Sequence, residues 1–303
     1  MTIPIVFAFD KNYFLAAAVT ISSLLDNSTE GEHYQIICLY SGLKKDELDW
    51  LMKLKDKYGK ASFRLVDMKN TFTDAPVLLE HLNYTVYYRL MIPDLFPNYD
   101  KIVYSDVDII FRRGMAGLWQ ESIGDNYVAG VLDRFVTEDT EFMKKRGFNG
   151  RLYINAGFLL YNNKKLIADN VPRNWLDEIG KPLNYYMDQD IINRVCEGHI
   201  KRLPLYYNCF SIDPKWKFLS KFPEAEIDEA FKRGNVHYTS KDKPWNNKKR
   251  FYRSNELIWW KYYWKLPFGS HKQVLRHFNI FVCRLLNTLV CVTEEKIKRR
   301  FSK

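Results

Sequence analysis

Short apolar runs and amphipathic stretches alternate from the start of the chain to about residue 130. The apolar runs at residues 4–9 and 34–41 are typical of buried strands, whereas residues 13–25 and 48–58 repeat their apolar positions at helical spacing. This alternation predicts an α/β fold with a mixed, mostly parallel central sheet. Further strands are predicted at residues 61–68, 101–111, 127–133 and 152–162, with a helical stretch at 84–91.

The pattern changes beyond residue 253. An aromatic run, WWKYYWKLPF, is followed by residues 271–292, where apolar side chains recur at steps of three or four. Arg276, His277 and Arg284 interrupt this run, so we expect an amphipathic helix, because a bilayer-spanning helix needs ~20 largely apolar residues. We therefore predict a main domain of residues 1–253 and a small, basic, aromatic-rich helical extension of residues 254–303.

The positive charge of the chain is concentrated in this extension. The whole chain has a formal net charge of +10, but residues 241–303 contain 16 Lys and Arg against 4 Asp and Glu, which leaves −2 for the remainder. Basic residues beside Trp and Tyr on an amphipathic helix favour contact with an anionic membrane surface. The alternative is that the apolar stripe packs on the main domain. No nucleic-acid-binding motif accompanies the charge, so we expect no nucleic-acid partner.

The cysteines indicate a reducing compartment. There are five of them, scattered along the chain, without the paired spacing of a structural zinc site. The first residues form a β-like run and lack the order of a secretory signal. We therefore expect a cytoplasmic protein, associated with the inner face of the membrane if the extension binds lipid.

Two acidic residues follow a strongly apolar strand. Asp106 and Asp108 come directly after residues 101–105, and alternate residues of an extended segment project to the same side. Two converging carboxylates provide the oxygen ligands that Mg²⁺ and Mn²⁺ prefer. Taken alone, the pair is equally compatible with a solvated turn. The same pattern also occurs in phosphatases of the haloacid dehalogenase type, although Ile110 stands where those enzymes usually have Thr or Val.

Five further segments, in order along the chain, favour the metal site over the solvated turn and the phosphatase. Together with the Asp-Val-Asp strand they resemble glycosyltransferase family 8, the retaining enzymes that include bacterial lipopolysaccharide galactosyl- and glucosyltransferases, over roughly residues 3–250. The resemblance implies a single GT-A (Rossmann-like) nucleotide-sugar-binding domain. The segments are FAFDKNY at residues 7–13, YYRL at 87–90, NAGFLLYN at 155–162, MDQDIIN at 187–193 and HYTSKDKPW at 237–245.

The resemblance also implies a metal and diphosphate site. His237 matches the third metal ligand beside Asp106 and Asp108, and Lys243 matches the lysine that meets the diphosphate. An imidazole beside two carboxylates favours Mn²⁺, with Mg²⁺ as the alternative. Ser240 stands where related enzymes often have Gly, which would affect the close approach of the backbone to a phosphate.

Other positions are implied to contact the donor. Asp10 and Tyr13 would bind the uridine, although Asp10 is also a common helix-capping residue type. Arg89 would reach the sugar and phosphate, the alternative being a buried ion pair with an Asp. Asp188 would bind sugar hydroxyls and Gln189 would lie beneath the anomeric carbon, whereas the simpler interpretation of Asp188 is a charge at a helix start. The remaining implied donor contacts are Ala8, Asn12, Asp106, Val107, Asn155, Ala156, Gly157, Ser240 and Lys243.

The sequence therefore predicts a metal-dependent, retaining hexosyltransferase. It would use UDP-glucose or UDP-galactose and transfer the sugar to a saccharide, glycolipid or glycoprotein acceptor, as in bacterial cell-surface glycan synthesis. Two alternatives remain, a phosphatase that uses the Asp-Val-Asp strand and a non-catalytic nucleotide-sugar-binding partner protein.

Overall fold

The structure is a computed structural model, which describes residues 1–79, 83–134, 140–148, 152–210, 217–239, 243–245, 255–267, 278–279 and 281–289. It divides into two compact units, Met1–His237 and Tyr238–Lys303, each of which is described by itself.

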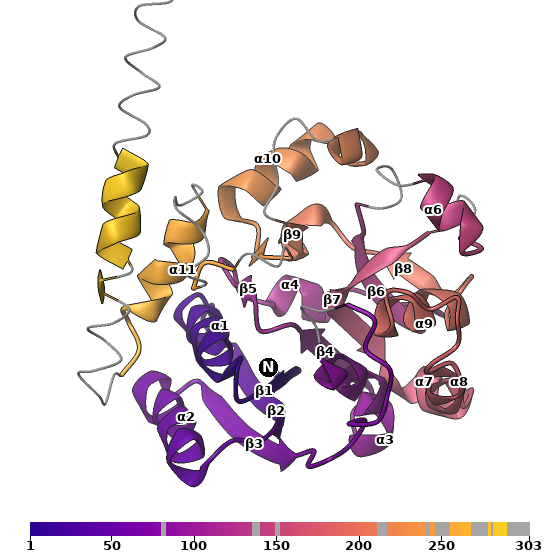
Figure 1. Cartoon of the computed structure of the whole chain (residues 1–303), viewed down its shortest axis with the longest axis horizontal. Coiled ribbons are helices and arrows are strands. Elements are labelled where there is room, and N and C mark those ends of the chain that lie inside the picture. The colour runs from indigo at the N-terminus through magenta and orange to yellow at the C-terminus, as the bar shows by residue number, and fades with distance from the viewer. Residues whose placement is uncertain are drawn as a thin grey trace, which may run out of the picture. The chain divides into compact units, whose positions relative to one another are not determined.

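A seven-stranded sheet forms the centre of the first unit, with the strand order β3-β2-β1-β4-β7-β6-β8 (Figure 1). Neighbouring strands are parallel from β3 to β4 and again between β6 and β8, and β7 alone runs antiparallel to both of its neighbours. The prediction of a mixed, mostly parallel sheet is confirmed. The strands are β1 (Thr2–Asp10), β2 (His33–Ser41), β3 (Ala61–Asp67), β4 (Lys101–Ser105), β6 (Val128–Leu132), β7 (Ile154–Asn162) and β8 (Ile200–Arg202).

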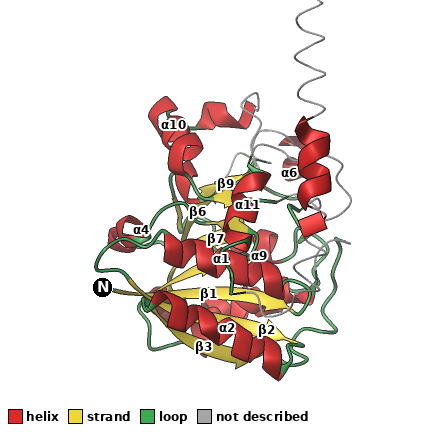
Figure 2. Cartoon of the chain, turned by 90° about the vertical axis from the view of Figure 1, so that its left-hand side faces the viewer, coloured by secondary structure: helices red, strands yellow, loops and turns green. Residues whose placement is uncertain are grey.

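Helical segments cover both faces of this sheet. Helices α1 (Phe14–Asp26) and α2 (Lys45–Tyr58) lie against one face (Figure 2). On the other face the 3₁₀ segment η1 (Tyr84–Met91) packs against β1, and helices α8 (Val171–Asp177) and α9 (Asp188–Val195) pack against η1, with α9 also contacting β7. Val6 and Ala8 of β1 belong to the same buried cluster as residues of these three elements. A strand that is buried on both faces reads as a continuous apolar run, which is why residues 4–9 show no polar alternation.

The predicted strand at residues 101–111 is divided between two sheets. Strand β4 ends at Ser105, residues 106–108 form a turn, and β5 (Ile109–Ile110) joins a second, three-stranded sheet with the order β5-β10-β9. The two carboxylates therefore converge through a turn, and the expected alternation along one extended strand is wrong at this point.

The small sheet determines where the segment that begins at His237 meets the acidic turn. Strand β10 (Val236–His237) pairs antiparallel with β5 and parallel with β9 (Cys209–Phe210), with His237 opposite Ile109. The residue that follows Asp108 is thus the pairing partner of His237. The remaining elements of the first unit are α3 (Ile92–Leu95), α4 (Ala116–Gln120), α6 (Thr140–Lys145), α7 (Asn163–Ala168), η2 (Leu205–Tyr207), η3 (Lys217–Lys221) and α10 (Glu224–Arg233).

The described part of the second unit is built on aromatic packing. Helix α11 (Glu256–Tyr263) and the helical residues 281–289 contact each other through rings, with Phe281 5.3 Å from Trp260 and 5.7 Å from Trp264 between ring centroids. The buried Arg284 donates to the carboxylate of Glu256 at 3.2 Å. Among the described residues, no helix combines the length and apolar character that crossing a bilayer requires. The rest of the predicted helix at 271–292 lies outside them.

Candidate functional site

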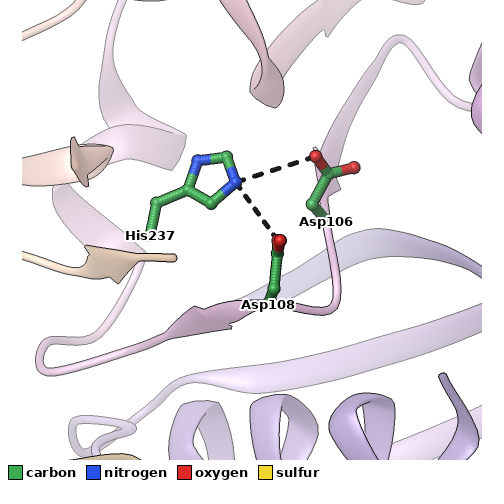
Figure 3. A group of neighbouring side chains, drawn as sticks. All are labelled: Asp106, Asp108 and His237. Atoms are coloured by element: carbon green, nitrogen blue, oxygen red, sulfur yellow. Dashed lines mark ion pairs between the residues drawn. The ribbon is translucent and has the colours of Figure 1, made fainter. Parts of the chain in front are cut away.

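Asp106, Asp108 and His237 converge at the junction of the two sheets (Figure 3). The Nε2 atom of His237 lies 3.1 Å from Asp108 Oδ1 and 3.9 Å from Asp106 Oδ2, and the three candidate ligand atoms lie within 4.8 Å of one another. His237 and Asp108 are buried, while Asp106 is partly exposed. This cluster has the donor set of a divalent-cation site, two carboxylate oxygens and one imidazole nitrogen.

The turn that carries the acid pair is held on both sides by hydrogen bonds. The backbone N–H of Asp106 donates to the carbonyl of Gly157 at 2.7 Å, and the Thr20 hydroxyl donates to the carbonyl of Val107 at 2.6 Å. Val107 is buried, so the turn is fixed from β7 on one side and from α1 on the other.

Gly157 leaves room for the cluster. A Cβ at this position would collide with Cε1 of His237 and would lie 2.8 Å from Asp106 Oδ2. Real Cβ atoms essentially never approach other atoms so closely, so any larger residue would displace the ring or the carboxylate. Only glycine fits this place without moving the cluster.

The other ring nitrogen of His237 contacts a residue that the sequence analysis missed. Nδ1 lies 2.8 Å from Oδ1 of Asn208, which is fully buried between η2 and β9. Asn208 also donates from Nδ2 to Asn155 Oδ1 at 2.9 Å. No sequence signal distinguishes this neutral amide in an aromatic segment.

Arg89 joins the acid pair to the start of α9. Its guanidinium lies 2.8 Å from Asp106 Oδ1 and 3.1 Å from Asp188 Oδ2, and it donates to the Ala156 carbonyl at 2.5 Å. It also lies over the Tyr104 ring at 4.5 Å. Burial lowers the pKa of Arg89, but Asp106 and Asp188 together raise it above its ordinary value, so the guanidinium stays charged. The buried ion pair considered from the sequence is present, and it involves two carboxylates.

Asp188 is buried in the first turn of α9. Burial raises the pKa of its carboxyl group, Arg89 opposes the rise and the charge of Asp106 adds to it, so that the pKa lies at about 7. Met187, immediately before it, has φ 46° and ψ −118°, a strained conformation for a residue with a side chain. Such strain is concentrated at functional sites, and here it sets the direction in which Asp188 and Gln189 leave the chain.

The side-chain amide of Gln189 is bonded at both ends. Its Oε1 accepts from Ala156 N at 3.0 Å and from Asn155 Nδ2 at 3.1 Å. Its Nε2 donates to Asp133 Oδ2 at 3.2 Å and to the Tyr153 hydroxyl at 3.1 Å. Four contacts therefore fix the rotamer of Gln189 and the orientation of its amide.

Asp133 is a second buried residue that the sequence analysis missed. Besides Gln189 it accepts from Asn155 Nδ2 at 2.9 Å. A signal for it did exist, because Asp133 follows the apolar strand β6 just as Asp106 follows β4.

The loop after β1 is arranged around Asp10. Its carboxylate accepts from the backbone N–H groups of Asn12 and Tyr13 at 2.9 and 3.2 Å, and from the side-chain amides of Asn12 and Asn83 at 2.9 and 3.0 Å. Four bonds use the lone-pair sites that a carboxylate offers, so Asp10 shapes the loop. Ala8 is buried two residues earlier.

Tyr13 lies near the acid pair. Burial, and after it the charges of Asp108, Asp10 and Asp106, raise the pKa of its hydroxyl to about 12. The structure therefore brings the first strand's loop and the Asp-Val-Asp turn together at one end of the sheet, where open α/β sheets bind ligands.

Two of the predicted residues belong to the second unit. The ammonium group of Lys243 is buried and donates to the Tyr238 carbonyl at 2.6 Å. Ser240 lies outside the described residues.

This arrangement of motifs agrees with a known family. A model of glycosyl transferase family 8 matches residues 4–249. The chain belongs to glycosyl transferase family 8. The family-8 match spans the segments on β1, η1, the acidic turn, β7, α9 and β10.

Individual relatives and solved structures agree with this assignment. The lipopolysaccharide 1,2-glucosyltransferase of Escherichia coli is 28% identical over 260 residues, covering 81% of this chain and 74% of that protein. A Haemophilus influenzae protein is 28% identical over 211 residues, covering 68% of this chain and 63% of that protein, so the family-8 chain spans less than two thirds of this relative. The crystal structure of the galactosyltransferase LgtC with donor and acceptor sugar analogs matches with a TM-score of 0.74 at 23% identity, over 89% of this chain and 98% of LgtC. The fold is GT-A.

Proposed function

We propose that this family-8 protein is a metal-dependent, retaining hexosyltransferase that moves glucose or galactose from UDP to a glycan acceptor. The observation that carries the proposal is the convergence of Asp106, Asp108 and His237. His237 is far from the two acids in the chain, and the three residues meet beside Arg89, whose guanidinium contacts Asp106 directly.

The donor set supports Mn²⁺, with Mg²⁺ as the alternative. Two carboxylates and an imidazole suit a borderline metal better than a purely oxygen-binding one. The fit is supported by Gly157, where a side chain would fill the space beside His237 and Asp106. When bound, a divalent ion there would supply electrostatic neutralisation of the diphosphate.

We propose that the uridine lies over the loop after β1, against Ala8, Asn12 and Tyr13. Asp10 supports this contact by holding the loop, and a direct bond from Asp10 to uracil or ribose would replace one of its four internal bonds. By their match to the family pattern, we keep Lys243 and Ser240 as the proposed diphosphate contacts.

We place the sugar between Arg89, Asp188, Gln189 and the β7 residues from Asn155 to Gly157. Gln189 is a weak nucleophile, and both ends of its amide are engaged by protein groups. We therefore favour attack by the acceptor hydroxyl on the face that the diphosphate leaves, with a phosphate oxygen accepting the proton. In this mechanism the amide oxygen of Gln189 stabilises the electron-poor anomeric carbon and forms no covalent bond to it.

We propose that the acceptor is a saccharide, glycolipid or glycoprotein of cell-surface glycan synthesis. The enzyme would act on it from the cytoplasm. Related proteins are lipopolysaccharide glucosyl- and galactosyltransferases. The basic second unit supports a peripheral contact with the anionic inner face of the membrane, since Phe278, Leu286 and Leu289 are more than half exposed. We retain residues 1–253 as the catalytic part and 254–303 as the membrane-binding part, close to the end of the family match at residue 249.

The decisive experiment measures the products formed from UDP-glucose and UDP-galactose with and without Mn²⁺. We expect metal-dependent release of UDP, and transfer when a saccharide acceptor is added, with both lost in Asp108→Asn. A phosphatase would release inorganic phosphate, and a non-catalytic binding protein would bind the donor without turnover. Either of these results would replace the proposal.

A further inference from the structure

We propose that Asn208 is a positioning residue of the metal site, which holds His237 in the one tautomer and orientation that direct its Nε2 lone pair toward the ion. The inference rests on the proposed function, because it concerns a ligand of the proposed metal. It adds a residue outside the ligand set and the donor contacts described above.

Two contacts of Asn155 determine which atom donates and which accepts in the hydrogen bond between Asn208 and His237. Asn155 Oδ1 accepts from the backbone N–H of Gly157 at 3.0 Å, and a backbone N–H can only donate. Asn155 Nδ2 lies 2.9 Å from a carboxylate oxygen of Asp133, which in its ionised form can only accept. The two ends of the Asn155 amide are therefore assigned by their surroundings.

The orientation of the Asn155 amide determines the orientation of the Asn208 amide. Asn155 Oδ1 is an acceptor, so the Asn208 atom 2.9 Å from it is the donor Nδ2. The opposite end of Asn208 is its oxygen, which faces Nδ1 of His237 at 2.8 Å. An oxygen there requires a proton on Nδ1, and the reversed amide would place two carbonyl oxygens against each other.

The consequence is a ring that is prepared for a metal. With its proton held on Nδ1, His237 presents Nε2 to the side where Asp108 Oδ1 and Asp106 Oδ2 lie at 3.1 and 3.9 Å. Hydrogen-bond partners of this kind fix the tautomer of a metal-binding His and raise its basicity, and their loss typically lowers metal affinity about 10- to 100-fold. Asn208 is fully buried, so bulk water does not compete with it for Nδ1 of His237 in the unmodified protein.

The same chain connects the metal site to the sugar site. Asn155 contacts Asn208 at one end, and at the other end Asp133 and the Oε1 atom of Gln189. A change at Asn208 therefore acts on His237 first, and Gln189 keeps its own bonds to Ala156 and Tyr153.

The experiment measures Mn²⁺ affinity directly, by counting free Mn²⁺ with electron paramagnetic resonance, without donor or acceptor. The variants are Asn208→Ala and Asn208→Leu, which remove the acceptor, and Asn208→Asp, which keeps an oxygen for the Nδ1 proton but replaces the donor to Asn155 Oδ1 by a second oxygen. His237→Ala reports whether the site exists. Asn163→Leu is the matched control, because Asn163 is also fully buried and donates to two backbone carbonyls, Phe96 and Tyr99, at the other end of β7.

We expect Asn208→Ala and Asn208→Leu to weaken Mn²⁺ binding about 10- to 100-fold. Asn208→Asp should bind Mn²⁺ more tightly than either of them, because it keeps an acceptor for the Nδ1 proton, and less tightly than the unmodified protein, because its second oxygen faces Asn155 Oδ1. Asn163→Leu should lower the unfolding temperature without changing Mn²⁺ affinity. If the Ala and Leu variants bind Mn²⁺ as tightly as the unmodified protein, or if folded Asn208→Asp binds as weakly as His237→Ala, the role assigned to Asn208 is wrong. Should the Ala and Leu variants fail to fold, the Asp variant alone decides. Failure of the unmodified protein itself to bind Mn²⁺ would instead overturn the proposed metal site.

Discussion

The backbone N–H of Asp106 donates to the carbonyl oxygen of Gly157 at 2.7 Å, so the first acid of the cluster and the glycine that leaves space for it are tied together. This bond brings β7 close enough that a methyl group at position 157 has no place. The metal site is therefore sensitive to one backbone position that carries no side chain.

The first prediction concerns this position. Gly157→Ala should weaken Mn²⁺ binding and transfer at least about tenfold, because the new Cβ displaces His237 or Asp106. Titration with Mn²⁺ and donor turnover measure the two effects. The control is Gly117→Ala in α4, where the nearest atom to the new Cβ is the Tyr207 hydroxyl at 3.3 Å, and which should keep both properties. Equal behaviour of the two variants would show that Gly157 is not required for spacing.

The second prediction concerns the buried ion pairs of Arg89. Arg89→Met leaves two carboxylates, Asp106 and Asp188, without their shared cation, and should lower the free energy of unfolding by about 3–5 kcal/mol. Adding Asp188→Asn should recover part of that loss, because the amide replaces a buried carboxyl group that the folded protein without Arg89 has to keep protonated. Urea unfolding of the single and double variants in the absence of metal measures the coupling. Simple additivity would contradict a direct interaction between Arg89 and Asp188.

The third prediction is a pH dependence that originates at Asp188. Its pKa is raised from 3.8 to about 7 in the folded protein, mainly by burial. Between these two values the folded state holds a proton that the unfolded state has released, so the free energy of unfolding falls as pH rises through this range. Urea unfolding of metal-free protein at about pH 5 and about pH 8, with Asp188→Asn as reference, isolates this contribution.

Relative to Asp188→Asn, the unmodified protein should lose stability between the two pH values. Asp106→Asn should reduce the effect, since the charge of Asp106 contributes to the raised pKa. An identical pH dependence of the unmodified protein and Asp188→Asn would refute the prediction.

How well the sequence predicted each helix or strand depended on the length of that element. The β-α-β-α-β order up to residue 67 could be predicted because long, strongly patterned segments carry their own periodicity. The three-stranded sheet could not, since each of its strands, β5, β9 and β10, has two residues. The meeting of His237 with the acid pair was therefore available only through the family resemblance.

Asp133 and Asn208, which hold other residues of the site in place, also differ in whether the sequence could have identified them. Asp133 follows an apolar strand and could have been noticed by the reasoning that identified Asp106. Asn208 could not, because it is a neutral side chain whose role depends on contacts with residues 29 and 53 positions away. Tertiary contacts of this kind leave no periodic trace in a single sequence.

The fourth prediction separates stabilisation from covalent catalysis at Gln189. Gln189→Ala should lower kcat about 100-fold and leave a measurable residual rate, because the variant removes one oriented amide while the diphosphate and acceptor contacts remain. Asp133→Asn changes the acceptor of the hydrogen bond from Gln189 Nε2, and should lower kcat by less than Gln189→Ala does. Steady-state kinetics with each donor measure both variants. Complete loss of transfer in folded Gln189→Ala would favour a nucleophilic role.

The last prediction addresses the exposed apolar side chains of residues 281–289. Leu286 and Leu289 are 57% and 56% exposed, one turn apart, on a helix whose buried side contacts α11 through Phe281 and Arg284. A face that is apolar and solvent-exposed beside many basic residues should enter the headgroup region of an anionic bilayer. Replacing both leucines by Asp should therefore reduce binding to vesicles of anionic lipid at least about tenfold, as measured by co-sedimentation, because each change removes apolar area and adds repulsion.

The matched control for this measurement is Ile167→Asp on α7, which changes an apolar side chain that is 36% exposed in the first unit. It should leave vesicle binding unchanged. Binding of the unmodified protein should fall with rising salt, because the basic residues contribute through screened attraction. Vesicle binding that survives both leucine substitutions would place the membrane contact elsewhere in the chain, and transfer to a soluble saccharide acceptor should be unaffected by them in either case.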